Sequence, residues 1–247
     1  MTIRAKEEAT ALEAAGRVVA RALAAMRAAV RPGLSTAELD AISAEVYRAE
    51  GARSAPRLVY DFPGTSCISV NDEVVHGVPG GRRLRAGDLL KLDVTAEKDG
   101  YMADAARTVS VGPPATVAAN LAACVRIAFR RAVALVRPGV PVRSIGREIE
   151  TVARRFGFSV VRELSGHGIG RTIHEPPAIP NFDDPVSRAR LEEGMVIAIE
   201  PIVSAGSGDA VLGSDGWTVR TADGSFAAHY EQTLVVTASG PRLLTRA

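Results

Sequence analysis

The sequence repeats itself at about half its length, and this duplication constrains the fold more than any other feature. Residues 31–34 read R-P-G-L, and residues 137–140 read R-P-G-V, so the offset is 106 positions. An Ala-rich or aliphatic helix is predicted before each copy, over 5–30 and 116–136, because Pro-Gly ends a helix. We therefore expect two similar halves.

A second helix is predicted after each R-P-G segment. In the first copy Ser35 and Glu38 form a capping-box pattern at its start. In the second copy Pro141 suits the first helical turn. Gly51 and Gly157 stand where C-terminal glycine caps belong.

A β-rich stretch follows in both halves. Residues 85–94 and 192–201 each combine a turn with a short apolar run, which is typical of a buried strand. Asp93 and Glu200 fall at equivalent places, which we predict to be the ends of equivalent strands. A weaker match relates Asp104 to Glu231, since each opens or interrupts a strand-like run after a Gly-aromatic pair.

These patterns predict an α+β fold with pseudo-twofold symmetry, built as a curved antiparallel sheet with helices on the outside. Each half lacks the length for a comfortable core of its own. We therefore expect a single domain over 1–247, made of two fused halves at about 1–112 and 113–247. Such a fold would bring the four acids together at its centre.

Four carboxylates inside a sheet repel one another unless they are protonated, paired with cations or bound to metal ions. A hairpin with Asp99 and Gly100 at its tip can place Asp93 beside Asp104. Oxygen ligands that can bridge suit a pair of divalent ions. A metal site is therefore one of three interpretations of the four acids.

The four histidines add a nitrogen donor to this picture. Glycines flank His76 and His167 and allow close approach of backbone or ligand. One imidazole with several carboxylates suits Mn, Fe, Co or Zn. His229 is interpreted as a neighbour of Glu231 without a role of its own, and Lys91 and Glu97 are expected at solvated strand positions.

Other chemistry has little support in the sequence. G-H-G-I-G (166–170) lacks the context of a phosphate loop. No G-x-S-x-G elbow accompanies Ser165, and Cys67 is interpreted first as a small buried hydrophobe.

Composition sets the broad class. Hydrophobic residues make up 47% and charged residues 23%, so the chain can bury a sizeable core. The net charge of +2 and the lack of a basic-aromatic cluster predict no nucleic-acid partner. Two cysteines, a charged start without an apolar h-region and no membrane-length apolar run predict a soluble cytoplasmic protein.

Taken together, several segments resemble the methionine aminopeptidases, which belong with prolidase to the "pita-bread" metallopeptidases. The matching segments, in the family's order, are C-I-S-V-N-D-E-V-V-H-G-V-P (67–79), K-L-D-V (91–94) with Asp104, S-G-H-G-I-G (165–170), H-E-P-P (174–177), I-E-P (199–201), D-G-W-T-V (215–219) and H-Y-E-Q-T (229–233).

The resemblance implies a centre of two divalent ions, Co, Mn, Fe or Zn, and five ligands. It assigns Asp93, Asp104 and Glu231 to one ion. It assigns Asp104, His167, Glu200 and Glu231 to the other, so that Asp104 and Glu231 bridge. It also implies that a metal-bridging hydroxide attacks the scissile carbonyl and that Glu200 accepts a proton.

The remaining roles implied by the resemblance belong to the substrate. His174 would stabilise the developing oxyanion, and His76 would contact the scissile amide or the residue after methionine. Phe62, Cys67 and Trp217, with Tyr60 nearby, would line an apolar methionine pocket that suits an unbranched thioether.

The expected function is removal of the initiator methionine from nascent proteins with a small second residue. The resemblance implies nascent polypeptide N-termini at the ribosome as partners, and a monomer. Only 26 residues separate His174 from Glu200, which fits type I. Ala103, Ala105, Ala106 and Ile173 depart from the family's pattern. Two alternatives stay open: an Xaa-Pro-type metallopeptidase and a non-catalytic binding protein on the same fold.

Overall fold

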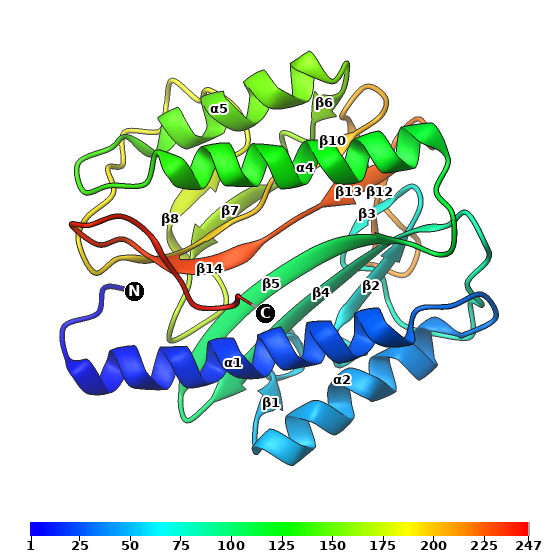
Figure 1. Cartoon of the computed structure of the whole chain (residues 1–247), viewed down its shortest axis with the longest axis horizontal. Helices are drawn as coiled ribbons and strands as arrows, with labels where there is room; N and C mark the ends of the chain where they lie inside the picture. The colour runs from blue at the N-terminus through cyan, green and yellow to red at the C-terminus, as the bar shows by residue number, and fades with distance from the viewer. Residues whose placement is uncertain (247) are drawn as a thin grey trace.

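In the computed structural model, which describes residues 1–246, helices from both halves cover one face of the strands. Figure 1 shows α1 and α2 along one side and α4 and α5 along the other, with β4, β5 and β14 between them. The helices are α1 Lys6–Ala29, α2 Thr36–Glu50, α3 Ala55–Tyr60, α4 Thr116–Ala134 and α5 Val142–Arg155.

The strands of both halves pair antiparallel throughout the described chain. They are β1 Arg53–Ser54, β2 Cys67–Val70, β3 Glu73–Val75, β4 Leu89–Lys98, β5 Tyr101–Ser110, β6 Ser159–Val160, β7 Ser165–Gly168, β8 Glu175–Pro180, β9 Val196–Ile199, β10 Ile202–Ser204, β11 Ala210–Leu212, β12 Val219–Thr221, β13 Ala227–His229, β14 Gln232–Val235 and β15 Arg242–Leu243.

The predicted helix boundaries follow from local chemistry. Ser35 accepts a hydrogen bond from the Glu38 backbone N–H while the Glu38 carboxylate accepts from the Ser35 N–H, so the capping box forms. Gly51 ends α2 in the left-handed conformation that glycine favours. In the second half Pro141 is the N-cap of α5, and Gly157 lies one residue beyond the C-cap Phe156.

Each half has its own apolar cluster beneath its helices. In the first, Val18, Val19 and Met26 of α1 pack with Leu92 and Val94 of β4. In the second, the cluster joins α4 and α5 to β9 and β10; its members include Leu121, Val125, Ile145, Ile149, Ile197, Ile199 and Val203.

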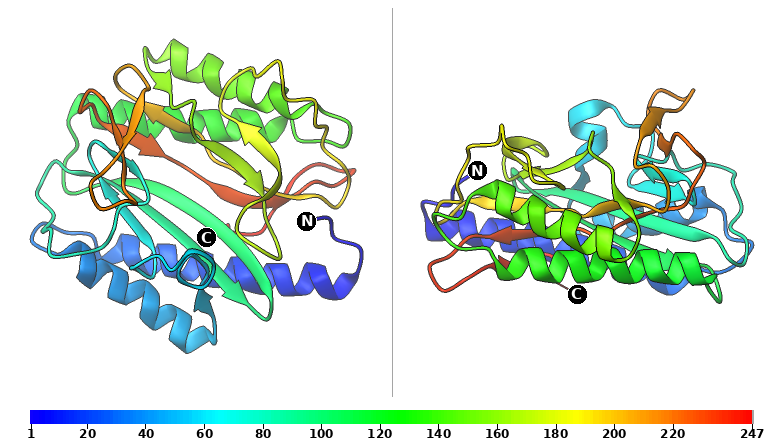
Figure 2. Two further views of the ribbon diagram at one scale, coloured as in Figure 1. Left: turned by 180° about the vertical axis from the view of Figure 1, so that it is seen from behind. Right: turned by 90° about the horizontal axis from the view of Figure 1, so that it is seen from above.

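Viewed from above, α3 and the β11–β12 hairpin rise from the face of the strands opposite to the four long helices α1, α2, α4 and α5 (Figure 2).

The two halves are hydrogen-bonded where β5 meets the segment from β13 to β14. The backbones of Ala106 and Glu231 exchange both hydrogen bonds, at 3.2 and 3.0 Å. On one side of this pair, the Thr108 hydroxyl accepts from His229 N and donates to His229 O. On the other side, the Thr233 hydroxyl accepts from Asp104 N and donates to Asp104 O, both at 2.9 Å. Two of the predicted acids therefore lie on this seam.

Three expectations about strand positions were wrong in detail. Asp93 lies inside the ten-residue β4, not at its end, because the strand continues to the Asp99–Gly100 turn. Lys91 is 1% exposed and donates to Asn71 O at 2.7 Å, and burial lowers its pKa to about 7. Glu97 is buried and pairs with Arg53. Both faces of β4 are covered by other parts of the protein, so polar residues in this strand do not mark a face exposed to solvent.

Within residues 1–246, none of the helices combines the length and the apolar character needed to span a bilayer.

Candidate metal centre

Four carboxylates from three strand regions converge where the two halves meet. In the β4–β5 hairpin Asp104 lies opposite Thr95, and Asp93 lies opposite Ala106. The two aspartates are therefore diagonal neighbours on one face of the hairpin. Glu200 follows β9 directly, and Glu231 lies between β13 and β14.

His167 is held with one ring nitrogen directed at these acids. Its Nδ1 lies 2.9 Å from Gly168 O, so the Nδ1–H donates there and Nε2 carries the free lone pair. That Nε2 lies 3.4 Å from Glu200 Oε1 and 3.8 Å from Glu231 Oε1. Donor atoms of Asp104, His167 and Glu231 all lie within 4.8 Å of one another, which is a spacing that can hold a metal ion.

The acids lack protein partners for several buried oxygens. Among the described residues, Asp93 Oδ1, Asp104 Oδ1 and Glu231 Oε1 are buried without a hydrogen bond. A buried carboxylate oxygen without a partner costs free energy comparable to a lost hydrogen bond or more. The donor set is hard oxygen with imidazole nitrogen, so these residues fit a divalent metal ion.

Burial also opposes ionisation of the acids. Burial raises the pKa of Glu200 to about 8, and the charge of Asp104 adds to this effect. Burial raises the pKa of Asp104 to about 6. The pKa values of Asp93 and Glu231 are raised well above the usual range by burial and by the neighbouring carboxylates. Bound cations would reverse this, because they favour the charged carboxylates.

The other two predicted histidines border the same space. His174 lies at the rim, and its ring centroid is 4.4 Å from that of His167. Its Nδ1 is 2.6 Å from the Tyr60 hydroxyl. His76 directly follows β3 and adopts a left-handed backbone conformation with φ of 57°. Burial, with a smaller contribution from His229, lowers the pKa of His76 to about 4, so the ring is neutral near pH 7.

Two cavities meet at these histidines. The acidic cavity has a volume of about 80 Å³ and contains the four acids with His76, His167, His174 and His229. The apolar slot, also about 80 Å³, shares His76, Asp93, Asp104 and His174 with it. The further lining residues of the slot are Pro56, Tyr60, Phe62, Cys67, Thr95, Ile173 and Trp217. The residues expected to line a methionine pocket are therefore gathered next to the acids.

Residues from separate segments pack together to form the slot. Phe62 and Trp217 meet edge to face with ring centroids 5.3 Å apart. Cys67 in β2 pairs in register with Asp93, which places the thiol beside the acids. Ile173, one of the residues departing from the family's pattern, is buried in the slot wall.

The three alanines around Asp104 have structural positions. Ala103 and Ala105 are fully buried in the apolar cluster beneath α1. Ala106 forms the backbone pair with Glu231. The small side chains of Ala103 and Ala105 let α1 pack closely on β5.

Sequence reasoning missed two features of this centre. His229 is 1% exposed and lines the acidic cavity. The interpretation of His229 as a neighbour of Glu231 without a role of its own did not anticipate this position. Thr233, which binds both backbone groups of Asp104, has only one signal in the sequence: a hydroxyl residue inside the apolar run Q-T-L-V-V.

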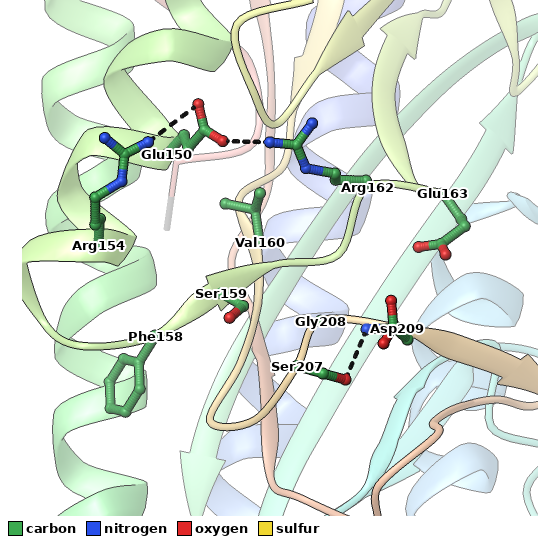
Figure 3. A pocket seen from close by; sticks show the side chains of 10 residues that line it. All are labelled: Glu150, Arg154, Phe158, Ser159, Val160, Arg162, Glu163, Ser207, Gly208 and Asp209. Carbon is green, nitrogen blue, oxygen red and sulfur yellow. Dashed lines mark hydrogen bonds and ion pairs between the residues drawn. The ribbon is translucent and has the colours of Figure 1, made fainter.

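A larger pocket of about 320 Å³ lies elsewhere, between α5, β6 and the loop around Gly208. Figure 3 shows Glu150 paired with both Arg154 and Arg162 at its edge. One carboxylate thus pairs with two guanidinium groups here, and none of the predicted site residues lines this pocket.

Comparison with known proteins agrees with the geometry. The family model for metallopeptidase family M24 matches residues 10–238, and the chain belongs to this family. "Methionine aminopeptidase 2" of Bacillus subtilis (strain 168) is 40% identical over 248 residues, covering 100% of both chains.

Solved structures show the same fold. A methionine aminopeptidase from Thermotoga maritima superposes with a TM-score of 0.96 at 34% identity, covering 100% of each chain. Prolidase from Pyrococcus furiosus superposes with a TM-score of 0.81 at 25% identity, and the match covers 66% of that longer chain. The predicted fold class and the family resemblance are confirmed.

Proposed function

We propose that this chain is a methionine aminopeptidase, which hydrolyses the peptide bond after an N-terminal methionine when the second residue is small. The observation that carries this conclusion is the junction of the two cavities. Buried acids with unpartnered oxygens adjoin a narrow apolar slot that opens past His76 and His174. A methionine side chain in the slot would present its scissile carbonyl to the acids.

The acids and His167 would hold two divalent ions. Asp93, Asp104 and Glu231 are assigned to one ion, and Asp104, His167, Glu200 and Glu231 to the other. The unpartnered oxygens and the free Nε2 of His167 support this ligand set. Mn, Fe, Co and Zn all accept it, and availability decides among them.

Bound ions would supply Lewis acidity and a water of lowered pKa to attack the scissile carbonyl. Glu200 lines the acidic cavity and would accept the proton of that water and pass it to the leaving amine. His174 at the rim would donate a hydrogen bond from Nε2 to the developing oxyanion while Tyr60 holds Nδ1. The neutral ring of His76 would bind the scissile amide or the next residue.

The slot favours an unbranched side chain. Its walls are mainly aromatic and aliphatic, and the thiol of Cys67 is uncharged because burial raises its pKa. A flexible thioether fills such a space and gains from contact with aromatic rings. Phe62, Cys67, Trp217 and Tyr60 are therefore assigned to methionine binding.

The alternatives have less support. The methionine aminopeptidases compared above match this chain end to end, whereas the prolidase is longer by about a third of its own length. A non-catalytic binding protein would have no need for a complete set of acids with unpartnered oxygens. We further propose that the two fused halves form one domain, since they share the backbone pair of Ala106 and Glu231.

The physiological partners would be the N-termini of nascent polypeptides in the cytoplasm, met at the ribosome, and the enzyme would act as a monomer. The test is release of free methionine from a Met-Ala-Ser peptide by metal-stripped protein, with and without added Co or Mn. A Glu200→Ala variant and an Xaa-Pro peptide are the controls. Metal-dependent release that the variant loses is expected. Cleavage of the Xaa-Pro peptide alone would refute the proposed specificity for methionine. Cleavage of neither peptide would refute the proposal that the protein is an aminopeptidase.

A further inference from the structure

His229 is a buried imidazole in the acidic cavity that the five-ligand set does not use. It ends β13, is 1% exposed, and lines the cavity together with Glu200 and Glu231. Among the described residues neither of its ring nitrogens has a hydrogen-bond partner. An imidazole with both nitrogens buried and unpartnered loses its hydration without compensation. The ring therefore needs a partner that the protein alone does not supply.

The position of the ring identifies the kind of partner. His229 Nε2 lies 3.3 Å from Glu200 Oε2 and 3.5 Å from Glu231 Oε2. His167 Nε2 lies near the other oxygen of each carboxylate, Oε1 in both cases. The two imidazoles thus flank the same pair of carboxylates on opposite sides.

These distances suit ligands around one ion better than direct hydrogen bonds. The His229 Nε2 is within reach of both carboxylates, yet hydrogen-bond geometry is met with neither. Two donors that each lie about 2.1 Å from a common ion are themselves about 3.0 to 3.5 Å apart. Glu200, His229 and Glu231 indeed form a second group whose donor atoms all lie within 4.8 Å.

The backbone holds the ring in this place. The Thr108 hydroxyl accepts from His229 N at 2.9 Å and donates to His229 O at 2.7 Å. On the other edge His229 pairs in register with Ile202 of β10. A donor whose backbone is hydrogen-bonded on one edge and lies in register with a neighbouring strand on the other is positioned before any ion arrives, which is what an effective ligand requires.

We infer that His229 is a sixth ligand of the proposed centre and binds an ion together with Glu200 and Glu231. The inference rests on the proposed function, because it needs a metal centre at these acids. The ion assigned to Asp104, His167, Glu200 and Glu231 would then have two imidazoles, from His167 and His229, which gives the centre an average of one imidazole per ion. The centre would be richer in nitrogen than the five-ligand set, which favours Co, Zn or Fe over Mn.

The test is metal binding, read independently of activity. Metal-stripped wild type, His229→Gln and the matched control His167→Gln are titrated with Co²⁺ and with Mn²⁺ by calorimetry. Glutamine keeps a similar volume and removes the imidazole. We expect each variant to weaken one of two Co²⁺ sites by at least tenfold, on the order seen when a metal site loses a supporting residue. The loss for Mn²⁺ should be smaller.

X-ray absorption of wild type loaded with two equivalents of Co²⁺ gives a second readout that needs no variant. We expect an average of about one imidazole per ion, and about half that number in either variant. Half an imidazole per ion in wild type overturns the inference, even if His229→Gln fails to fold. Equal losses for Co²⁺ and Mn²⁺ with an unchanged imidazole count would mean that His229 only positions the carboxylates, which also overturns it.

The failure of the proposed function is distinguishable from the failure of this inference. A wild type that binds no divalent ion and releases no methionine overturns both. A wild type that binds two ions and releases methionine, while His229→Gln keeps the same affinities and imidazole count, overturns the sixth ligand alone.

Discussion

Replacing Thr233 with valine should destabilise the protein at the seam between its halves. The Thr233 hydroxyl is the hydrogen-bond partner of both Asp104 N and Asp104 O, each at 2.9 Å. Thr233 is fully buried, and Asp104 is 5% exposed. Valine has nearly the same shape but no hydroxyl, so it leaves one backbone donor and one acceptor of Asp104 without partners.

The magnitude follows from those two groups. A buried polar group left without a partner costs about 1 to 3 kcal/mol, so the expected loss for the two groups is about 2 to 6 kcal/mol. For a domain of this size, a loss of that order lowers the midpoint of thermal unfolding by roughly 4 to 24 °C. Thr233→Ser is the matched control, because it keeps the hydroxyl and removes one methyl group at a cost of about 1 kcal/mol.

The assay is urea unfolding of metal-stripped protein, followed by circular dichroism and by the fluorescence of Trp217. Coincident curves for wild type would support unfolding of both halves as one domain. We expect valine to lower the free energy of unfolding well below that of serine. The reasoning is refuted if the two variants are equally stable, or if valine is within about 1 kcal/mol of wild type, which is less than one lost partner costs.

Two further predictions concern the proposed active site and the buried thiols. Tyr60→Phe removes the hydrogen bond to His174 Nδ1 and should lower kcat/KM for Met-Ala-Ser by about 3- to 10-fold, since one such bond contributes about 0.5 to 1.5 kcal/mol. Calorimetry should show unchanged metal affinity, and an unchanged kcat/KM would contradict the role given to Tyr60. Burial raises the pKa of Cys124 to about 12 and that of Cys67 well above its usual range. Both thiols therefore stay protonated near neutral pH and should resist iodoacetamide in the native protein. Mass spectrometry should find both modified in guanidinium, and rapid labelling of Cys124 in the native protein would contradict its burial.

The local features of the fold could be predicted from the sequence because neighbouring residues determine them. The capping box of Ser35 and Glu38 and the left-handed Gly51 depend on contacts within a few positions. The duplication placed Asp93 with Glu200 and Asp104 with Glu231 as related pairs. It therefore indicated, before any coordinates, that acids from both halves meet.

Only the tertiary structure decided what surrounds those acids. His229 lies beside Glu200 because β10 and β13 pair, and Thr233 reaches Asp104 across 129 positions of sequence. The Tyr60–His174 contact joins positions 114 apart. Lys91 looked like a solvated strand residue because periodicity reports one face of a strand, whereas both faces of β4 are covered. Register and packing between distant segments set these contacts, and no local pattern in the sequence encodes them.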